Sequence, residues 1–147
     1  MDISVKTTEG IREQVSLADN SKVWVNSNST LKYAADYKDD RQMRLVGDAY
    51  FKIRKSDKSF TLTTDQITLI MYDGTFQVES FPEKGHTRVA LFAGEAKILI
   101  KDLNQEIIMN PGTDLRLEKS LGEMEVLHIK EGVKGPAWII NKYEYMN

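Results

Sequence analysis

The chain has 147 residues, the length of one domain and enough to bury a substantial core without a disulfide or metal. It contains no cysteine, which excludes cysteine nucleophiles, zinc knuckles and iron–sulfur clusters. Its 20 basic and 22 acidic residues nearly cancel, which argues against a nucleic-acid-binding surface. Its apolar stretches are far shorter than the roughly 20 residues of a membrane-spanning helix. Length and composition therefore indicate a globular domain.

Apolar and polar residues alternate through most of the chain, which is the pattern of strands with one buried face. The clearest alternating segments, in chain order, are residues 14–17, 23–25, 42–45, 49–53, 60–63, 75–79, 96–101 and 115–117. Three further segments, 67–72, 107–109 and 126–129, are apolar on both faces and predict central strands covered on both sides. No window of 11 residues carries a capped helical period.

Turn residues separate these segments at short intervals. Asp19-Asn20 and Asp73-Gly74 suit tight hairpin turns, because these residue types tolerate positive φ angles. Asn110-Pro111-Gly112 predicts another turn, and residues 34–40 predict a loop or a single helical turn. On the order of a dozen short strands at this spacing predict an all-β fold. The architecture is expected to be a β-sandwich or a solenoid-like wrapped arrangement with little helix.

The last segment of the chain is strongly apolar. Residues 137–147 include Trp138, Ile139, Ile140, Tyr143 and Tyr145. Such a segment is expected to pair with something, either as a strand that closes this domain or as the start of a truncated second domain. We therefore place one all-β domain at 1–136 and a separate C-terminal segment at 137–147. Pairing of this segment between two copies would also give a homodimer.

The two histidines do not form a recognisable catalytic or metal-binding motif. His86 and His128 are 42 residues apart, and the chain has neither a nucleophile elbow nor a paired-histidine motif. They are interpreted as one surface histidine and one strand histidine. An enzyme built on a β scaffold would need an orienting group and a nucleophile within hydrogen-bond reach of them.

Acidic residues and glycines give no stronger signal. Asp39-Asp40, Glu79 and Glu83 stand out only through adjacency, whereas a glycosidase needs two convergent carboxylates. The nine glycines are scattered singly, so no phosphate-binding loop is present. No catalytic, cofactor-binding or metal-binding residue is therefore predicted, and the chain is expected not to be an enzyme.

The aromatic residues leave one other function class open. A carbohydrate-binding module would present exposed aromatic faces, and Trp24 and Tyr50 are the candidates. Each lies between apolar neighbours, so packing within or between sheets is the favoured interpretation. A secreted or cell-surface carbohydrate-binding β module is therefore kept as an alternative function.

A series of segments, in order, resembles the FecR family domain. They are residues 7–10, 15–26, 29–33, 41–53, 59–60, 76–78, 89–98, 110–112 and 137–145. The most specific parts are D-N-S-K-V-W-V-N at 19–26 and G-D-A-Y-F at 47–51, where the family reads D-G-S-x-V-W-L-N and G-E-A-Y-F. The departures are Asn20 and Asn141 for Gly, Asp48 and Ala93 for Glu, and a Gly-Thr pair displaced by one residue.

The resemblance implies a periplasmic signalling domain of a transmembrane anti-sigma factor. Such proteins relay a signal from the signalling domain of an outer-membrane TonB-dependent transducer to an extracytoplasmic-function sigma factor. The sigma factor would be held by a cytoplasmic part, and that part and the membrane anchor are expected to lie outside this chain. The resemblance implies no cofactor and no nucleic-acid partner.

The best-matched residues are expected to hold the fold and not to contact a partner. They are Trp24, Asn26, Gly47, Tyr50, Phe51, Gly94, Pro111 and Gly112. Strand edges are the expected vehicle for protein contacts, because an unpaired edge adds a partner strand through backbone hydrogen bonds. The sequence identifies no individual partner-binding residue.

Overall fold

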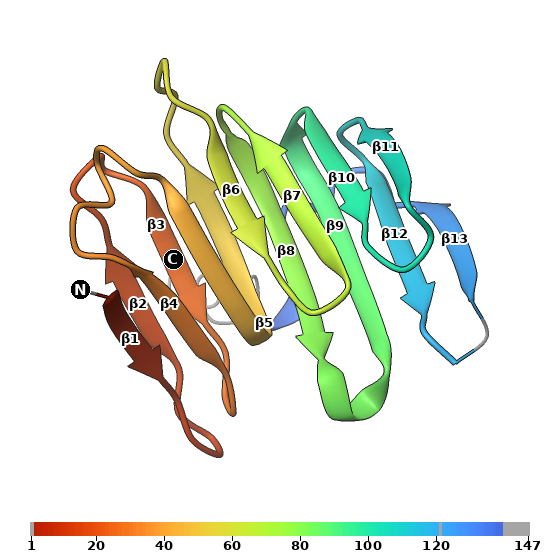
Figure 1. Ribbon diagram of the computed structural model, residues 1–147, viewed down its shortest axis with the longest axis horizontal. Coiled ribbons are helices and arrows are strands. Elements are labelled where there is room, and N and C mark those ends of the chain that lie inside the picture. The colour runs from red at the N-terminus through yellow and green to blue at the C-terminus, as the bar shows by residue number, and fades with distance from the viewer. Residues whose placement is uncertain (1, 121, 140–147) are drawn as a thin grey trace.

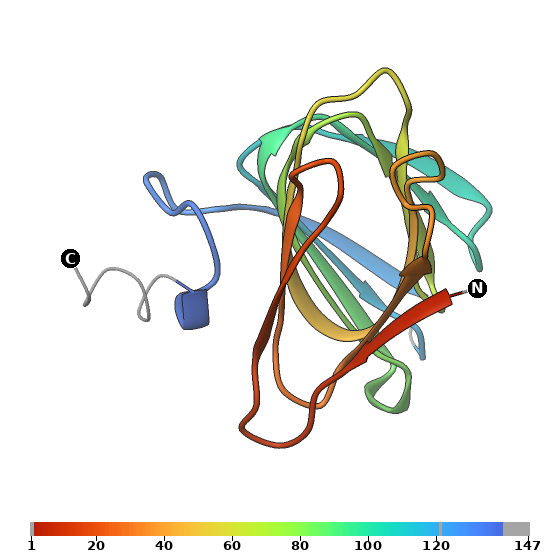
Figure 2. The ribbon, with the colours of Figure 1, turned by 90° about the vertical axis from the view of Figure 1, so that its left-hand side faces the viewer.

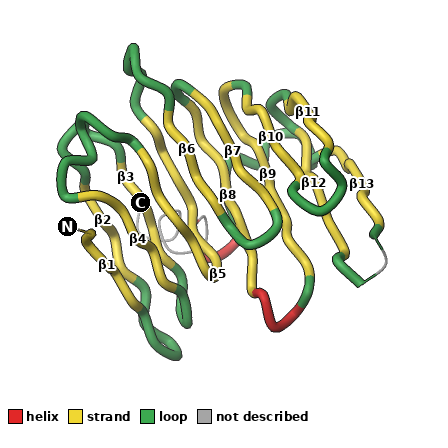
Figure 3. Tube along the Cα trace, in the orientation of Figure 1, coloured by secondary structure: helices red, strands yellow, loops and turns green. Residues whose placement is uncertain are grey.

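The computed structural model describes residues 2–120 and 122–139, which form two β-sheets that share one strand (Figures 1 and 3). Sheet A contains, in spatial order, β1 (Asp2–Lys6), β4 (Thr30–Ala34), the first part of β5 (Gln42–Ile53), β6 (Phe60–Thr63), β7 (Ile67–Met71), β10 (Ala96–Ile100) and β11 (Gln105–Met109). Sheet B contains β2 (Glu13–Ser16), β3 (Lys22–Val25), the second part of β5, β8 (Gly74–Phe81), β9 (His86–Gly94), β12 (Thr113–Glu118) and β13 (Glu123–His128).

The chain wraps by alternating between the two sheets. After β5, each antiparallel hairpin lies in one sheet and the next lies in the other: β6–β7 in A, β8–β9 in B, β10–β11 in A and β12–β13 in B. The pairing of β5 with β6 is parallel, and the other pairings are antiparallel. The result is one curled sheet that closes around its own interior like a half-barrel (Figure 2). The predicted all-β, wrapped architecture with little helix is confirmed.

Helix is correspondingly scarce. The 3₁₀ helix η1 (Pro82–Lys84) connects β8 to β9, and residues 137–139 form a helical turn. Within 2–120 and 122–139, no helix has the length and apolar character required to span a bilayer.

Strand β5 passes from sheet A to sheet B at Gly47. Gly47 has a φ of 124°, a value that residues with a Cβ atom rarely adopt. A Cβ atom there would also overlap Ser29. The Ser29 hydroxyl instead accepts a hydrogen bond from the Asp48 backbone N–H at 2.9 Å. The expectation that Gly47 serves the fold is therefore explained by a close backbone approach at the bend.

The interior between the sheets is filled by apolar side chains. Phe51 and Phe76 of sheet B stack with ring centroids 4.6 Å apart, and Phe60 of sheet A lies 6.1 Å from Phe76. All three rings are fully buried. Burial of an aromatic ring of this size contributes about 2 to 3 kcal/mol each, so this cluster is a major part of the core.

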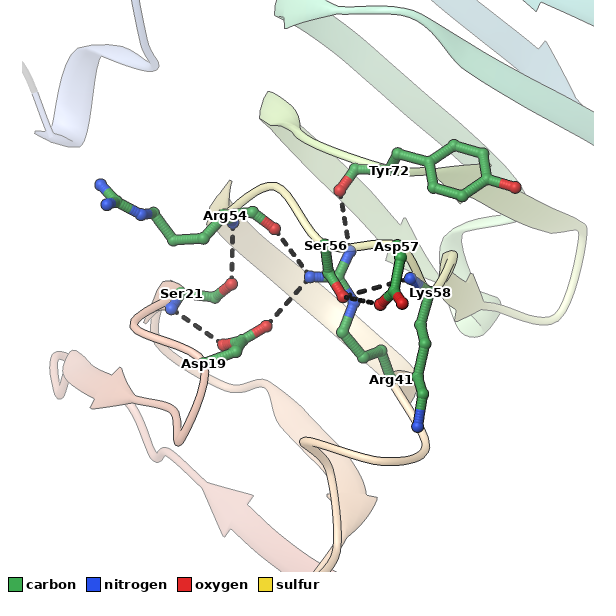
Figure 4. Close-up of polar contacts among 8 residues, drawn as sticks. All are labelled: Asp19, Ser21, Arg41, Arg54, Ser56, Asp57, Lys58 and Tyr72. Carbon is green, nitrogen blue, oxygen red and sulfur yellow. Dashed lines mark hydrogen bonds and ion pairs between the residues drawn. The ribbon is translucent and has the colours of Figure 1, made fainter.

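A buried arginine just before β5 ties four parts of the chain together, including the residue that follows β5 (Figure 4). The Arg41 guanidinium donates to Oδ2 of Asp19 at 3.1 Å, to the carbonyl of Arg54 at 2.7 Å and to the carbonyl of Tyr72 at 2.8 Å. Its side chain is 0% exposed. Asp19 also accepts the Ser21 N–H, and the Ser21 hydroxyl accepts the Arg54 N–H. Arg41 thus joins the β2–β3 turn, both ends of β5 and the residue after β7.

Two of the three segments expected to be central strands are edge strands. The prediction holds for 67–71, since β7 lies between β6 and β10. It is wrong for 107–109 and 126–129, because β11 and β13 are the last strands of their sheets, and Ile108 and Val126 are each 51% exposed. A short apolar run does not distinguish a strand with neighbours on both sides from one that ends a sheet.

The two predicted hairpin turns have different outcomes. Asp19-Asn20 does form the β2–β3 hairpin, with Asn20 at a φ of 69°. Asp73-Gly74 does not form a hairpin, because it links β7 in sheet A to β8 in sheet B. Gly74 has a φ of 153°, and a Cβ atom there would meet the Ala93 carbonyl oxygen at 2.5 Å. Gly74 is therefore required by the close approach of β8 to β9.

Replacing Arg41 with Met is expected to destabilise the domain by about 3 to 5 kcal/mol, because the Asp19 carboxylate and two carbonyls lose their buried donor. Chemical denaturation should show a lower midpoint with an unchanged slope. Arg41→Lys keeps the charge but not the planar fork, so it should recover only part of the loss. Arg44→Met, an exposed change in the adjoining strand β5, should stay within about 0.5 kcal/mol of the parent. A small loss for Arg41→Met would contradict this role.

Candidate interaction surface

The two histidines lie at opposite ends of strand β12. His86 begins β9 and pairs in register with Glu118, and its Nε2 lies 3.3 Å from Oε1 of Glu79. His128 ends β13 and pairs in register with Thr113. Five positions along a strand correspond to about 17 Å, so the two rings do not converge on one site.

The carboxylates singled out by adjacency do not assemble either. Asp39 and Asp40 are exposed in the turn between β4 and β5, where Asp39 forms a 3.7 Å ion pair with Lys58. Glu83 is exposed in η1. In the ranges that the structure describes, no group of three or more His, Asp or Glu residues is arranged to hold a metal ion.

A buried carboxylate lies just after the bend of β5. Asp48 is 6% exposed. Its Oδ2 accepts a hydrogen bond from the Asn26 side-chain amide at 3.0 Å, and its Oδ1 accepts one from the Gln77 side-chain amide at 2.9 Å. Burial raises the pKa of Asp48, and the two amide hydrogen bonds oppose that rise by stabilising the charged form. The arrangement fastens the end of β3 to β5 and β8, which gives Asn26 the structural role expected of it.

A second polar group lies on the outer face of β9 and β12. The Asp114 carboxylate accepts hydrogen bonds from Nε of Arg88 at 3.1 and 3.0 Å, and Arg116 approaches it at 3.4 Å. Asp114 is 4% exposed. One nearly buried carboxylate therefore compensates two guanidinium groups on this face.

Three aromatic side chains form a ridge on the outer face of sheet B. The Trp24 and Tyr50 ring centroids are 5.5 Å apart, and those of Tyr50 and Phe92 are 6.0 Å apart. Tyr50 is buried, and Trp24 and Phe92 are half-buried. This resembles the aromatic platform that a carbohydrate-binding module needs, so what covers it matters.

Residues 129–139, here called the strap, cross the outer face of sheet B after β13 (Figure 2). The Tyr50 hydroxyl donates to the Lys134 carbonyl at 3.1 Å, and Gly135 lies against the Tyr50 ring. Burial raises the pKa of Tyr50 to about 12. The Arg12 guanidinium lies over the Trp138 ring, 5.5 Å from its centroid. The strap thus covers part of the ridge, which disfavours its use as an open sugar platform.

The C-terminal segment is described only at its start. Of the residues 137–147 expected to form a closing strand or the start of a second domain, 137–139 form the helical turn. Trp138 packs against Arg12, which immediately precedes β2. Residues 140–147 lie outside the described residues, so their predicted pairing stays a prediction.

The two ends of sheet B are protected differently. The edge strand β2 has four residues, and its exposed Glu13 pairs in register with the buried Val25, so a charged residue lies on the inner face of the sheet edge. A short edge strand with an inward charge is a common protection against strand pairing. Within the described residues, β13 at the other end pairs with β12 alone.

The edge strand β13 presents apolar side chains on its inner face. Met124 and Val126 pair in register with the buried Leu117 and Leu115, so all four lie on one face. Met124 is 39% exposed and Val126 is 51% exposed. Figure 1 shows β13 at the far end of the molecule, beyond β11 of the facing sheet. Of the two ends of sheet B, this edge is the less protected against a partner strand.

Sequence reasoning predicted that strand edges carry contacts but not which edge. The signal was present in the alternation of Glu123, Met124, Glu125 and Val126. It was obscured because residues 126–129 read as apolar on both faces. The asymmetry became visible only once the sheet order placed β13 last.

Comparisons with known proteins agree with this architecture. A family model described as FecR protein matches residues 3–97. Two crystal structures of a "putative anti-sigma factor" from Parabacteroides distasonis superpose on the chain with TM-scores of 0.82 and 0.80, at 20% and 19% sequence identity. They match 88% and 86% of this chain. No curated protein matches.

The chain spans 61% and 60% of those two structures, so the similarity covers about three fifths of each. At this level of identity the superpositions establish a shared fold. The family match covers well over half of the residues and includes the bend at Gly47 and the G-D-A-Y-F segment. This chain belongs to the FecR family.

Proposed function

We propose that this chain is the periplasmic signalling domain of a transmembrane anti-sigma factor. It relays a signal from an outer-membrane TonB-dependent transducer to an extracytoplasmic-function sigma factor held by a cytoplasmic part of the same protein. The observation that carries the proposal is membership of the FecR family, together with a fold shared with structures described as anti-sigma factors.

The arrangement of side chains favours a module that works through protein contacts. The space between the sheets is filled by a packed core that includes the three stacked and tilted phenylalanine rings. The buried Asp48 is engaged by two amides on its own sheet. The geometry therefore supports binding at surfaces and edges better than chemistry at an internal site.

The test of this proposal uses the full-length protein in its native host with a reporter for the sigma-dependent promoter. Removing this domain in frame should abolish the response of the promoter to the inducer of the transducer. Arg41→Met should reduce the response in proportion to loss of folded domain, and Arg44→Met should leave it unchanged. An intact response without the domain would overturn the proposal.

The strap connects β13 to the C-terminal segment, so a conformational change in the sheets would reach that segment through it. Two side chains hold the strap beyond Ile129: Tyr50, which donates to the Lys134 carbonyl, and Arg12, which lies over the Trp138 ring. Neither contact belongs to the β-sheet ladders. The strap can therefore loosen without unfolding the domain.

Replacing Tyr50 with Phe should loosen the strap and leave the sheets intact. Loss of one hydrogen bond costs about 1 kcal/mol, so the Ile139 amide, which donates to the Pro136 carbonyl, should exchange with solvent roughly fivefold faster. Amides of β5 and β8 should be unaffected. Tyr72→Phe, at an exposed ring, is the matched control. Unchanged exchange at Ile139 would show that Tyr50 does not hold the strap.

A further inference from the structure

The unpaired edge of β13 combines backbone hydrogen-bonding groups with two chemically distinct side-chain faces. Its inner face carries the exposed apolar side chains of Met124 and Val126. Its outer face carries Glu123 and Glu125, which pair in register with Glu118 and Arg116. In a six-residue edge strand about three residues direct their N–H and C=O groups away from the sheet.

The acidic groups on the outer face are not compensated by this chain. Among the described residues, no cationic side chain lies within 4.0 Å of the carboxylates of Glu118, Glu123 or Glu125. The nearby guanidinium of Arg116 approaches Asp114 instead. These three glutamates and Glu79 line a groove of about 790 Å³ that borders β13, together with His86, Arg88 and Arg116. Its four carboxylates outnumber its two guanidinium groups, and both guanidinium groups approach Asp114. The outer side of this edge therefore favours a basic partner.

We propose that the β13 edge accepts an extended segment of a partner protein as an additional strand, in which apolar residues alternate with basic ones. The apolar residues would lie beside Met124 and Val126 and extend the core. The basic residues would lie beside Glu123 and Glu125, since opposite charges on neighbouring strands attract. This inference rests on the proposed function, because it names the surface through which a relay module meets its partner.

A second copy of this chain fits the edge poorly. Pairing β13 antiparallel with another β13 about Glu125 would place the two Glu125 side chains opposite each other on the outer face, and such a like-charge pair is destabilising. Pairing β13 with the β2 of another copy would place Glu13 beside the apolar inner positions, where burial of a charge is costly. The chemistry of the edge therefore favours a different protein.

The described strap does not occupy this edge. The strap leaves β13, crosses sheet B and brings Trp138 to Arg12, next to the opposite edge strand β2. The described chain therefore ends far across the sheet from β13, as Figure 2 shows for the departing strap.

The test is a titration of the 147-residue protein with blocked heptapeptides, followed by amide NMR. The probe peptide alternates lysine and valine, and the control peptide alternates glutamate and valine. The lysine peptide should bind and shift the amides of 123–128, whereas the glutamate peptide should bind at least about tenfold more weakly. A lysine peptide N-methylated on the edge that pairs should also lose binding, because the added strand needs its N–H donors.

Two variants make the result specific. Glu123→Lys with Glu125→Lys should reverse the preference between the peptides, and Glu106→Lys, an exposed change on β11, should not. Failure of the lysine peptide to bind, shifts at β2 or β11 instead, or an unchanged preference in the double variant would overturn the proposal. If no peptide binds but the promoter response still requires this domain, only the proposal for the β13 edge is rejected. If the lysine peptide binds but the promoter response does not require this domain, only the proposed function is rejected.

Discussion

The buried Arg41 guanidinium is the interaction on which the wrapped fold most depends. It satisfies the carbonyls of Arg54 and Tyr72 and the Asp19 carboxylate at the place where β5 begins and where the chain passes from β7 to β8. A chain that changes sheet after every hairpin leaves carbonyls unpaired at its crossings, and each would be costly if buried without a donor. One planar group with several donors serves two such crossings, after β5 and after β7, and also holds the Asp19 carboxylate of the β2–β3 turn. Gly47 provides the matching freedom farther along β5, where the strand changes sheet.

The order of the sheets then determines which surfaces remain available. Because successive hairpins are added on one side, the domain has a beginning, at β1 and β2, and an end, at β11 and β13. The beginning of sheet B is protected by a short strand with Glu13 on its inner face, and the strap brings Trp138 under the preceding Arg12. The end carries Met124 and Val126 in the open.

The sequence predicted the all-β class, the wrapped architecture and the FecR family, because period-two alternation and ordered motifs are local properties of the chain. It did not predict that Asp73-Gly74 links the two sheets, since a turn that changes sheet uses the same residue types as a hairpin turn. It also misplaced β11 and β13, because strand order depends on long-range pairing. Arg41 was part of a matched motif, but its burial among three distant segments has no local sequence signal. The same holds for the strap, whose contacts join residues 12 and 138.

The central claim is that this domain acts by adding a partner strand at β13. The most direct measurement is hydrogen exchange of the domain with and without the purified signalling domain of the proposed transducer. The account predicts slower exchange for edge-facing amides of residues 123–128 and unchanged exchange for residues 13–16. Protection confined to the β2 end, or no protection at either edge while the two proteins remain bound, would contradict it.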